Sequence, residues 1–170
     1  MDLKKYIRNI PDFPKKGILF KDITTLLNNK KAFKSAIDNL AKLLKNKKID
    51  YIVAAESRGF LFAGALCYKL GCGLVPVRKP GKLPYKTYQH TYSLEYGCDS
   101  LEIHQDAFPE NSKVLILDDL LATGGTALAL IALAKKLKAD IVGVTFLIEL
   151  TGLNGKDKLR NYPVYSLIKF

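Results

Sequence analysis

The stretch VLILDDLLATGGT, residues 114–126, decides the fold that this sequence predicts. Its first four residues are apolar and are bounded by charged ones, a pattern typical of a strand buried in a sheet. Two aspartates follow, and then a Thr-Gly-Gly-Thr turn that opens an apolar helix over 126–137. A strand, a glycine turn and a helix in this order predict a unit of a parallel sheet, with the turn at the carboxyl end of the strand.

The rest of the chain repeats this alternation. Apolar residues at helical spacing predict further helices over 32–44 and 59–70. Short apolar runs predict strands over 51–55, 74–77, 141–148 and 164–168. Strands that alternate with helices of about a dozen residues predict an α/β fold, in which helices cover both faces of a central parallel sheet.

Two segments depart from this alternation. The first ten residues predict a short amphipathic helix, ended by Pro11 and Pro14, whose apolar face holds Leu3, Tyr6, Ile7 and Ile10. Between Lys79 and Ser112 the core pattern is lost, and alternation over 93–104 predicts a hairpin. A segment this long with so little core pattern is usually functional or mobile.

Length and composition predict one soluble globular domain. A chain of 170 residues with 48% hydrophobic and 25% charged residues is neither disordered nor fibrous. Its longest apolar stretches fall short of the ~20 residues that a membrane span needs. The N-terminal segment MDLKKYIRNIP has no apolar core for secretion, and three cysteines without a Cys-x-x-Cys pair predict reduced thiols. We therefore expect a cytoplasmic protein with no membrane partner.

The net charge of +11 allows two interpretations. Many of the 27 basic residues are lysines in pairs on predicted helix faces, as on an ordinary solvated surface. A net positive field also attracts anions such as nucleic acids or polyphosphates. The sequence leaves both interpretations open.

The residues after the central strand suit a phosphorylated sugar. In open α/β sheets, ligands bind at the carboxyl ends of the strands. Asp118 and Asp119 are acceptors suited to two neighbouring sugar hydroxyls, and they converge only if the strand ends there. Glycines admit a close backbone approach, and a helix start offers free N–H groups to a phosphate, which indicates a loop made of Ala122, Thr123, Gly124, Gly125 and Thr126. The alternative is a helix cap followed by turn-forming glycines.

This segment resembles the phosphoribosyl pyrophosphate (PRPP) motif of the type I phosphoribosyltransferases. Five further segments, in the family's order along most of the chain, resemble its adenine phosphoribosyltransferases: DFPKKGILFKDITTLL (12–27), ESRGFLFA (56–63), RKPGKLP (78–84), YSLEYG (92–97) and IELTGL (148–153). Three positions depart from the family's common residues, since Lys16, Lys21 and Ala63 stand where proline, arginine and glycine are usual.

The resemblance implies a purine salvage reaction, in which adenine and PRPP give AMP and pyrophosphate. It implies magnesium bound with PRPP or pyrophosphate, with no direct metal ligand from the chain, and a homodimer. The fold implied is one phosphoribosyltransferase domain over 1–170, with an N-terminal hood from about 1–30 and a lid over about 79–105.

The resemblance also implies roles for individual residues. Arg58, which follows a predicted strand, would neutralise pyrophosphate together with Lys79 and Lys82, although a surface salt bridge is the alternative for each. Glu95 would be the acid–base residue near adenine, beside Tyr96 in the lid, while Glu102 is a competitor that the alternation does not exclude. The residues placed around adenine are Leu19, Phe20, Lys21 and Leu150, for which the sequence alone favours core packing.

Two other functions remain open at this stage. One is transfer to a different base, such as hypoxanthine, guanine or xanthine. The other is a PRPP-sensing regulator that binds nucleic acid through its basic surface. The fold pattern uses nearly the whole chain and leaves no room for a separate DNA-binding module, so a nucleic-acid partner is not expected.

Overall fold

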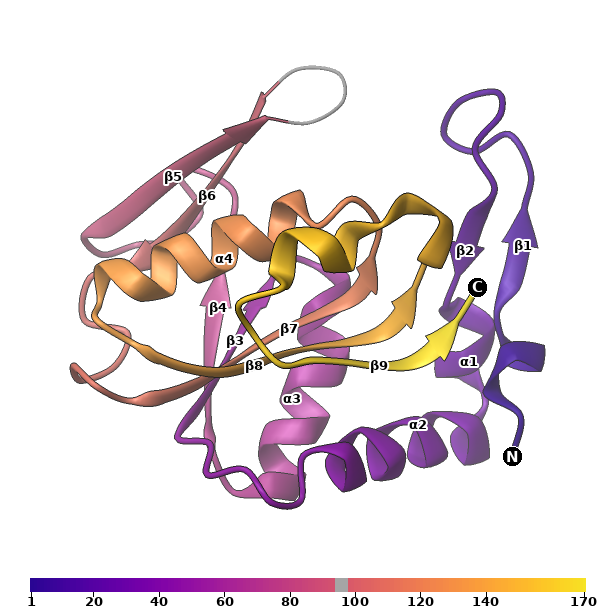
Figure 1. Ribbon diagram of the computed structural model, residues 1–170, viewed down its shortest axis with the longest axis horizontal. Helices are drawn as coiled ribbons and strands as arrows, with labels where there is room; N and C mark the ends of the chain where they lie inside the picture. The colour runs from indigo at the N-terminus through magenta and orange to yellow at the C-terminus, as the bar shows by residue number, and fades with distance from the viewer. Residues whose placement is uncertain (94–97) are drawn as a thin grey trace.

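A five-stranded parallel sheet forms the centre of the computed structural model, which describes residues 1–93 and 98–170 (Figure 1). The strands lie in the order β4-β3-β7-β8-β9, and every neighbouring pair is parallel. Their bounds are Tyr51–Ala55 for β3, Gly73–Val77 for β4, Lys113–Leu121 for β7, Asp140–Glu149 for β8 and Val164–Lys169 for β9. The predicted parallel sheet is confirmed.

Helices cover both faces of this sheet (Figure 1). One face carries α4 (Gly125–Lys136), and the other carries α2 (Lys30–Leu43) and α3 (Arg58–Leu70), with the short α1 (Thr24–Asn28) preceding α2. Because successive strand residues point to opposite faces, each strand contributes to two cores. In β3, Ile52 packs in the core that contains Phe62 of α3, whereas Val53 packs in the core that contains Leu130 of α4.

The N-terminal segment differs from the predicted helix. A 3-10 helix, η1, covers only Leu3–Tyr6, and β1 (Arg8–Ile10) then pairs antiparallel with β2 (Phe20–Asp22). The prediction is therefore wrong beyond Tyr6. Main-chain pairing with β2 and an ion pair of 2.6 Å between Arg8 Nη2 and Asp22 Oδ2 hold this backbone extended, while Ile7 remains buried as the apolar spacing indicated.

The predicted hairpin is present and is longer than the alternation indicated. β5 (Thr87–Ser93) pairs antiparallel with β6 (Cys98–His104), and Lys136 of α4 donates a hydrogen bond to the Gln89 carbonyl. The hairpin and the β1–β2 pair project on the same side of the molecule, at the top of Figure 1. Among the helices of the described residues, none has the length and apolar content to cross a membrane.

Two short 3-10 helices follow β8, namely η2 (Thr151–Leu153) and η3 (Gly155–Leu159). Gly155 brings η3 against the turn between β7 and α4 so closely that a Cβ there would overlap the Ala122 carbonyl oxygen. From the other side, a Cβ at Gly124 would lie 2.8 Å from the Gly155 oxygen, and Gly124 also has a φ of +83°. Both positions therefore require glycine.

We predict that Gly155→Ala destabilises the fold, since the added methyl group must push the Ala122 turn aside. Overpacking of this kind costs ~1–3 kcal/mol of unfolding free energy. Gly152→Ala is the matched control, because a Cβ at Gly152 meets no atom within 4 Å. Urea unfolding of both variants measures the difference. Equal stabilities would show that the turn yields without cost.

Candidate functional site

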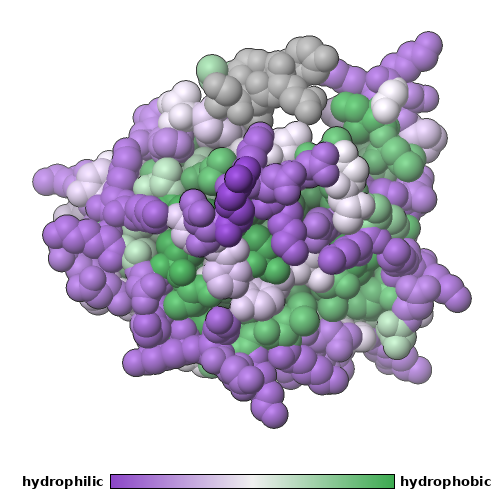
Figure 2. Space-filling view, in the orientation of Figure 1, coloured by the Kyte–Doolittle hydropathy of each residue, from purple (hydrophilic) through white to green (hydrophobic). Residues whose placement is uncertain are grey.

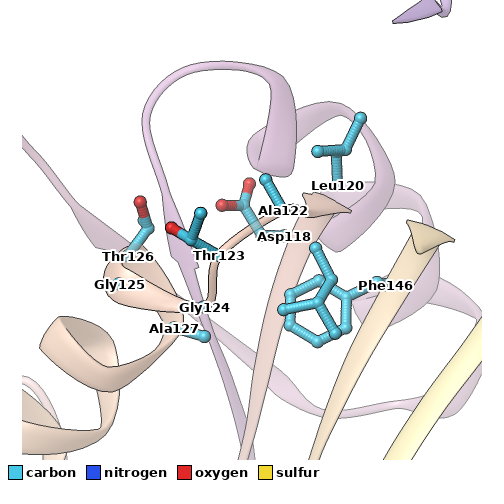
Figure 3. Close-up of a pocket in the computed structure, with 10 residues that line it drawn as sticks. Asp118, Leu120, Ala122, Thr123, Gly124, Gly125, Thr126, Ala127 and Phe146 are labelled. Carbon is cyan, nitrogen blue, oxygen red and sulfur yellow. The ribbon is translucent and has the colours of Figure 1, made fainter. Parts of the chain in front are cut away.

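The two aspartates lie within β7, which continues to Leu121. We expected the two acids to converge only if the strand ended there, and this condition was wrong. Both carboxylates nevertheless line one pocket of about 180 Å³ at the carboxyl end of the sheet. Helices α3 and α4 both begin at this edge, so side chains on the two faces of β7 border the same space. Asp118 lies beside the turn before α4 (Figure 3). Asp119 pairs with Arg58 at the start of α3.

Burial is the main influence on the charge of this pair. Asp119 is 4% exposed. Removal from water raises the pKa of both carboxyls, and the charge of Asp119 raises the pKa of Asp118 further, well above its ordinary range. The Arg58 guanidinium, with Nε 2.9 Å from Asp119 Oδ2, opposes the rise at Asp119. Hydroxyl donors from a ligand would favour the ionised forms of both.

The turn from Ala122 to Thr126 forms a second hollow that shares Asp118 and Thr126 with the first. In Figure 3 the oxygens of Asp118, Thr123 and Thr126 lie on the same side of the turn, and Phe146 of β8 lies on the other side. Gly124 caps α4, so the N–H groups of the first helical turn have no partners within the helix. Two hydroxyls and several free N–H groups suit a phosphate group.

The three predicted cations lie at this edge of the sheet, and each has a carboxylate partner. Arg58 and Lys79 line the pocket, where Lys79 Nζ is paired with Asp99 of β6. Lys82 Nζ lies 2.7 Å from Oε1 of Glu56, which also lines the pocket. All three cations thus form ion pairs, and those of Arg58 and Lys79 lie inside a ligand-sized pocket.

Glu56 organises the loop that follows β4. Its Oε2 accepts a hydrogen bond of 2.7 Å from the Lys79 main chain and lies 3.3 Å from Nε of Arg78. Burial alone would raise the pKa of Glu56, but the hydrogen bonds from Lys82 and the Lys79 main chain leave it lowered. The peptide bond between Glu56 and Ser57 is cis.

The hairpin adds two pocket residues that sequence reasoning missed. The Tyr92 hydroxyl lies 3.2 Å from Asp99 Oδ2 and 3.5 Å from the Thr126 hydroxyl. Burial acts to raise the pKa of Asp99, but the hydrogen bond from Lys79 lowers it. Asp99 falls in the alternating stretch of the sequence and Tyr92 directly precedes it. The alternation does not show which side chains face the pocket, because that depends on how the hairpin packs on α4.

The two acids that competed for the acid–base role have different outcomes. Glu95, like Tyr96, lies outside the described residues. Glu102 is buried, and its Oε2 accepts a hydrogen bond of 3.1 Å from the Gly81 N–H. Its main chain also exchanges two hydrogen bonds with Arg78. Glu102 therefore fixes the loop after β4.

The hood places an aromatic ring beside the pocket. The Phe20 ring centroid lies 5.0 Å from Cζ of Arg58. Leu19, the preceding residue, is 51% exposed, and Phe13 and Ile18 in the same N-terminal segment are exposed as well. Lys21 is buried, and its burial, with the charge of Lys4, lowers its pKa.

Leu150 lies at the carboxyl end of β8, half-buried, and its N–H donates to the Leu121 carbonyl at 2.9 Å. The structure thus places Leu150 beside the end of β7, near the turn that begins at Ala122. Across residues 1–93 and 98–170, no group of three or more His, Cys, Asp or Glu side chains is arranged to hold a metal ion.

Similar proteins were found for the whole chain. The sequence matches the phosphoribosyl transferase domain over residues 22–169. The adenine phosphoribosyltransferase of Brachyspira hyodysenteriae is 61% identical over the full length of both chains. The crystal structure of adenine phosphoribosyltransferase from Thermoanaerobacter pseudethanolicus has a TM-score of 0.97 at 56% identity and covers 99% of this chain and 98% of its own.

A more distant solved structure carries ligands. The adenine phosphoribosyltransferase of Saccharomyces cerevisiae, in complex with adenine and an imino-altritol bisphosphate, has a TM-score of 0.91 at 45% identity and covers 98% of this chain and 96% of its own. The resemblance seen in six sequence segments thus extends over the whole length and the whole fold. This chain belongs to the adenine phosphoribosyltransferases, within the phosphoribosyl transferase domain family.

Proposed function

We propose that this chain transfers the phosphoribosyl group of PRPP to adenine, producing AMP and pyrophosphate in purine salvage. The observation that carries the proposal is the pocket at the end of β7, where two buried carboxylates, a phosphate-sized turn and paired cations share one space. That the accepting base is adenine is inferred from the family to which the chain belongs. The anomeric carbon of PRPP exchanges its bond to a pyrophosphate oxygen for a bond to adenine, through an oxocarbenium-like state.

The turn and the aspartates bind the part of the substrate that does not change. The N–H groups and hydroxyls from Ala122 to Thr126 hold the 5′-phosphate at the start of α4. Asp118 and Asp119 accept hydrogen bonds from the two ribose hydroxyls, which would oppose the rise in pKa that burial causes at both carboxyls. Fixing the ribose at two points orients its anomeric carbon toward the base.

The cations receive the leaving group. Arg58, Lys79 and Lys82 exchange their present carboxylate partners for pyrophosphate oxygens, and Arg58 matches two oxygens at once through its planar fork. A magnesium ion bound with PRPP or pyrophosphate supplies further charge neutralisation. In this proposal the ion would be held chiefly by phosphate oxygens and water, as Mg²⁺ commonly is.

The base lies between the hood and the end of β8. Leu19 and Phe20 form one wall, Leu150 forms the other, and the main chain of Lys21 meets the edge of adenine. Glu95 and Tyr96 close over the reacting carbon from the segment that joins β5 to β6. When the base nitrogen bonds to the ribose carbon, adenine loses a ring proton, and Glu95 is the carboxylate proposed to take it.

We further propose that the protein is a cytoplasmic homodimer. The outer face of α3 exposes Leu61 and Tyr68, which lie about two helical turns apart, and Tyr68 is 93% exposed. Leu74 of β4, the edge strand of the sheet, is also exposed. An apolar stripe beside an open sheet edge favours contact with a second copy. Free thiols at Cys67, Cys72 and Cys98 favour a reducing compartment.

Product formation from PRPP and magnesium with each of adenine, hypoxanthine, guanine and xanthine tests the proposed function. We expect AMP from adenine and far slower turnover of the other bases. A site built to pair with one set of base edge groups leaves buried polar groups unpaired with another. Comparable use of hypoxanthine would overturn the assignment of the base.

Binding of AMP and PRPP should fail in the double variant Asp118→Asn, Asp119→Asn. The change keeps the shape and removes two charged acceptors, whose hydrogen bonds are each worth ~1.5–3 kcal/mol. Calorimetric titration measures both affinities. The control is Asp38→Asn, Asp140→Asn, which removes the same charge from ion pairs on α2 and β8 away from the pocket. Unchanged affinity for either ligand in the folded first variant contradicts the ribose role.

Glu95→Gln should lower the turnover rate by ~10²–10⁴-fold, the usual contribution of a general acid–base residue. The PRPP affinity should barely change, because the phosphate and ribose contacts lie on other segments. Glu102→Gln is the internal control, since a glutamine oxygen still accepts from the Gly81 N–H. Steady-state kinetics decide between them, and a slow Glu102→Gln beside a normal Glu95→Gln would refute the assignment.

A further inference from the structure

Phe170, which follows β9, joins two parts of the chain that the proposed function places on opposite sides of adenine. Its ring lies under the side chain of Lys21 in β2, with Nζ 3.9 Å from the ring centroid. Lys4 of η1 lies near the same ring at 5.5 Å. The ring therefore contacts the hood strand that carries Phe20.

The main chain of Phe170 is hydrogen-bonded to the segment around Leu150, which the proposed function places on the other side of adenine. Its N–H donates to the Glu149 carbonyl at 2.9 Å, and its carbonyl accepts from the N–H of Thr151 at 2.9 Å and from the Thr151 hydroxyl at 2.7 Å. Glu149 and Thr151 flank Leu150 in the sequence. Three hydrogen bonds to Phe170 therefore fix the backbone on both sides of Leu150.

Lys21 is equally constrained on the hood. Its Nζ donates to Asn9 Oδ1 at 2.8 Å, and Asn9 is its partner in the register of β1 and β2. The side chain is buried, with 8% of the residue exposed. An ammonium group taken out of water needs partners, and the face of an aromatic ring is one that strengthens as water is excluded. The contact between Lys21 and Phe170 therefore depends both on the positive charge of the lysine and on the aromatic ring.

We propose that Lys21 and Phe170 are positioning residues that set the separation between the two walls of the adenine slot. The main chain of Phe170 is hydrogen-bonded on both sides of Leu150, which forms one wall. Its ring contacts Lys21, which follows Leu19 and Phe20 of the other wall, so Phe170 acts as a spacer between the two walls. This inference rests on the proposed function, because the slot is defined by the base. Loss of the spacer lets the walls move relative to each other and weakens adenine binding, while the PRPP contacts on the β7–α4 turn stay in place.

The test compares Phe170→Leu and Lys21→Met, each alone and together, by KM for adenine and by PRPP affinity. We expect each single variant to raise the KM for adenine by about 5- to 30-fold, the range for a partly desolvated cation–aromatic contact, with PRPP affinity within about 2-fold of the wild type. The double variant should have a KM for adenine no higher than that of Lys21→Met alone, because Lys21→Met already removes the ring contact together with the hydrogen bond to Asn9. Phe170→Tyr and Lys21→Arg keep a ring and a cation and should restore the KM.

The control is Lys135→Met, which removes a lysine lying 5.3 Å over the Tyr162 ring on the α4 side of the sheet. It should leave both constants unchanged. If Phe170→Leu does not fold, Lys21→Met and its arginine counterpart carry the test. If the wild type makes AMP but the single variants leave the KM for adenine unchanged, the spacer role is overturned and the proposed function stands. The spacer role is also overturned if the single variants lose PRPP affinity as strongly as they raise the KM for adenine. A wild type that makes no AMP overturns the proposed function and the spacer together.

Discussion

Arg58 and Asp119 meet at 2.9 Å where Asp119 is almost wholly buried, and the arrangement of the site depends on this contact. A carboxylate taken out of water at the end of β7 is costly unless a charge or several donors face it. Arg58 is the first residue of α3, so the ion pair also fixes where that helix begins against the sheet. Removing Arg58 would leave the charge of Asp119 buried without this partner.

Further ion pairs between a carboxylate and a cation lie along the same edge of the sheet. Lys79 is paired with Asp99 of the hairpin, and Glu56 joins Arg78 and Lys82 on the loop after β4. Each carboxylate comes from a different element than its cation, so the ion pairs tie β3, β4, β6 and β7 together around the pocket. In the proposed function, a pyrophosphate group that took over these cations would free their carboxylates, which would couple binding of the leaving group to the position of the hairpin.

The sequence was sufficient for the regular parts of this fold, and four of the residues that it singled out, Arg58, Lys79, Asp118 and Asp119, line one pocket. Apolar runs of four to eight residues and helical spacing located the sheet and its covering helices, because burial on both faces leaves a pattern in the residues themselves. The hood was misjudged, since Ile7 and Ile10 fit a helix as well as they fit a strand, and pairing with β2 decides between the two. Asp99 and Tyr92 were missed for a related reason, because alternation shows that a strand has two faces but not what lies opposite each. Gly155 gave no signal at all, since its need for glycine comes from the Ala122 turn, more than thirty residues away.

Charge at the site differs from charge over the chain as a whole. The chain carries +11, and hydrophilic side chains cover much of the face seen in Figure 2. At the carboxyl edge of the sheet, however, four cations (Arg58, Arg78, Lys79 and Lys82) face four carboxylates (Glu56, Asp99, Asp118 and Asp119). The surrounding field draws anions in general, whereas this balanced edge does not favour an anion by itself. In the proposed function, a phosphate alone would pair with the cations and leave Asp119, which is 4% exposed, without Arg58 as its partner. A ligand with both phosphate oxygens and neighbouring hydroxyls would satisfy both sets, so the proposed preference for a phosphorylated ribose would depend on the carboxylates as much as on the cations.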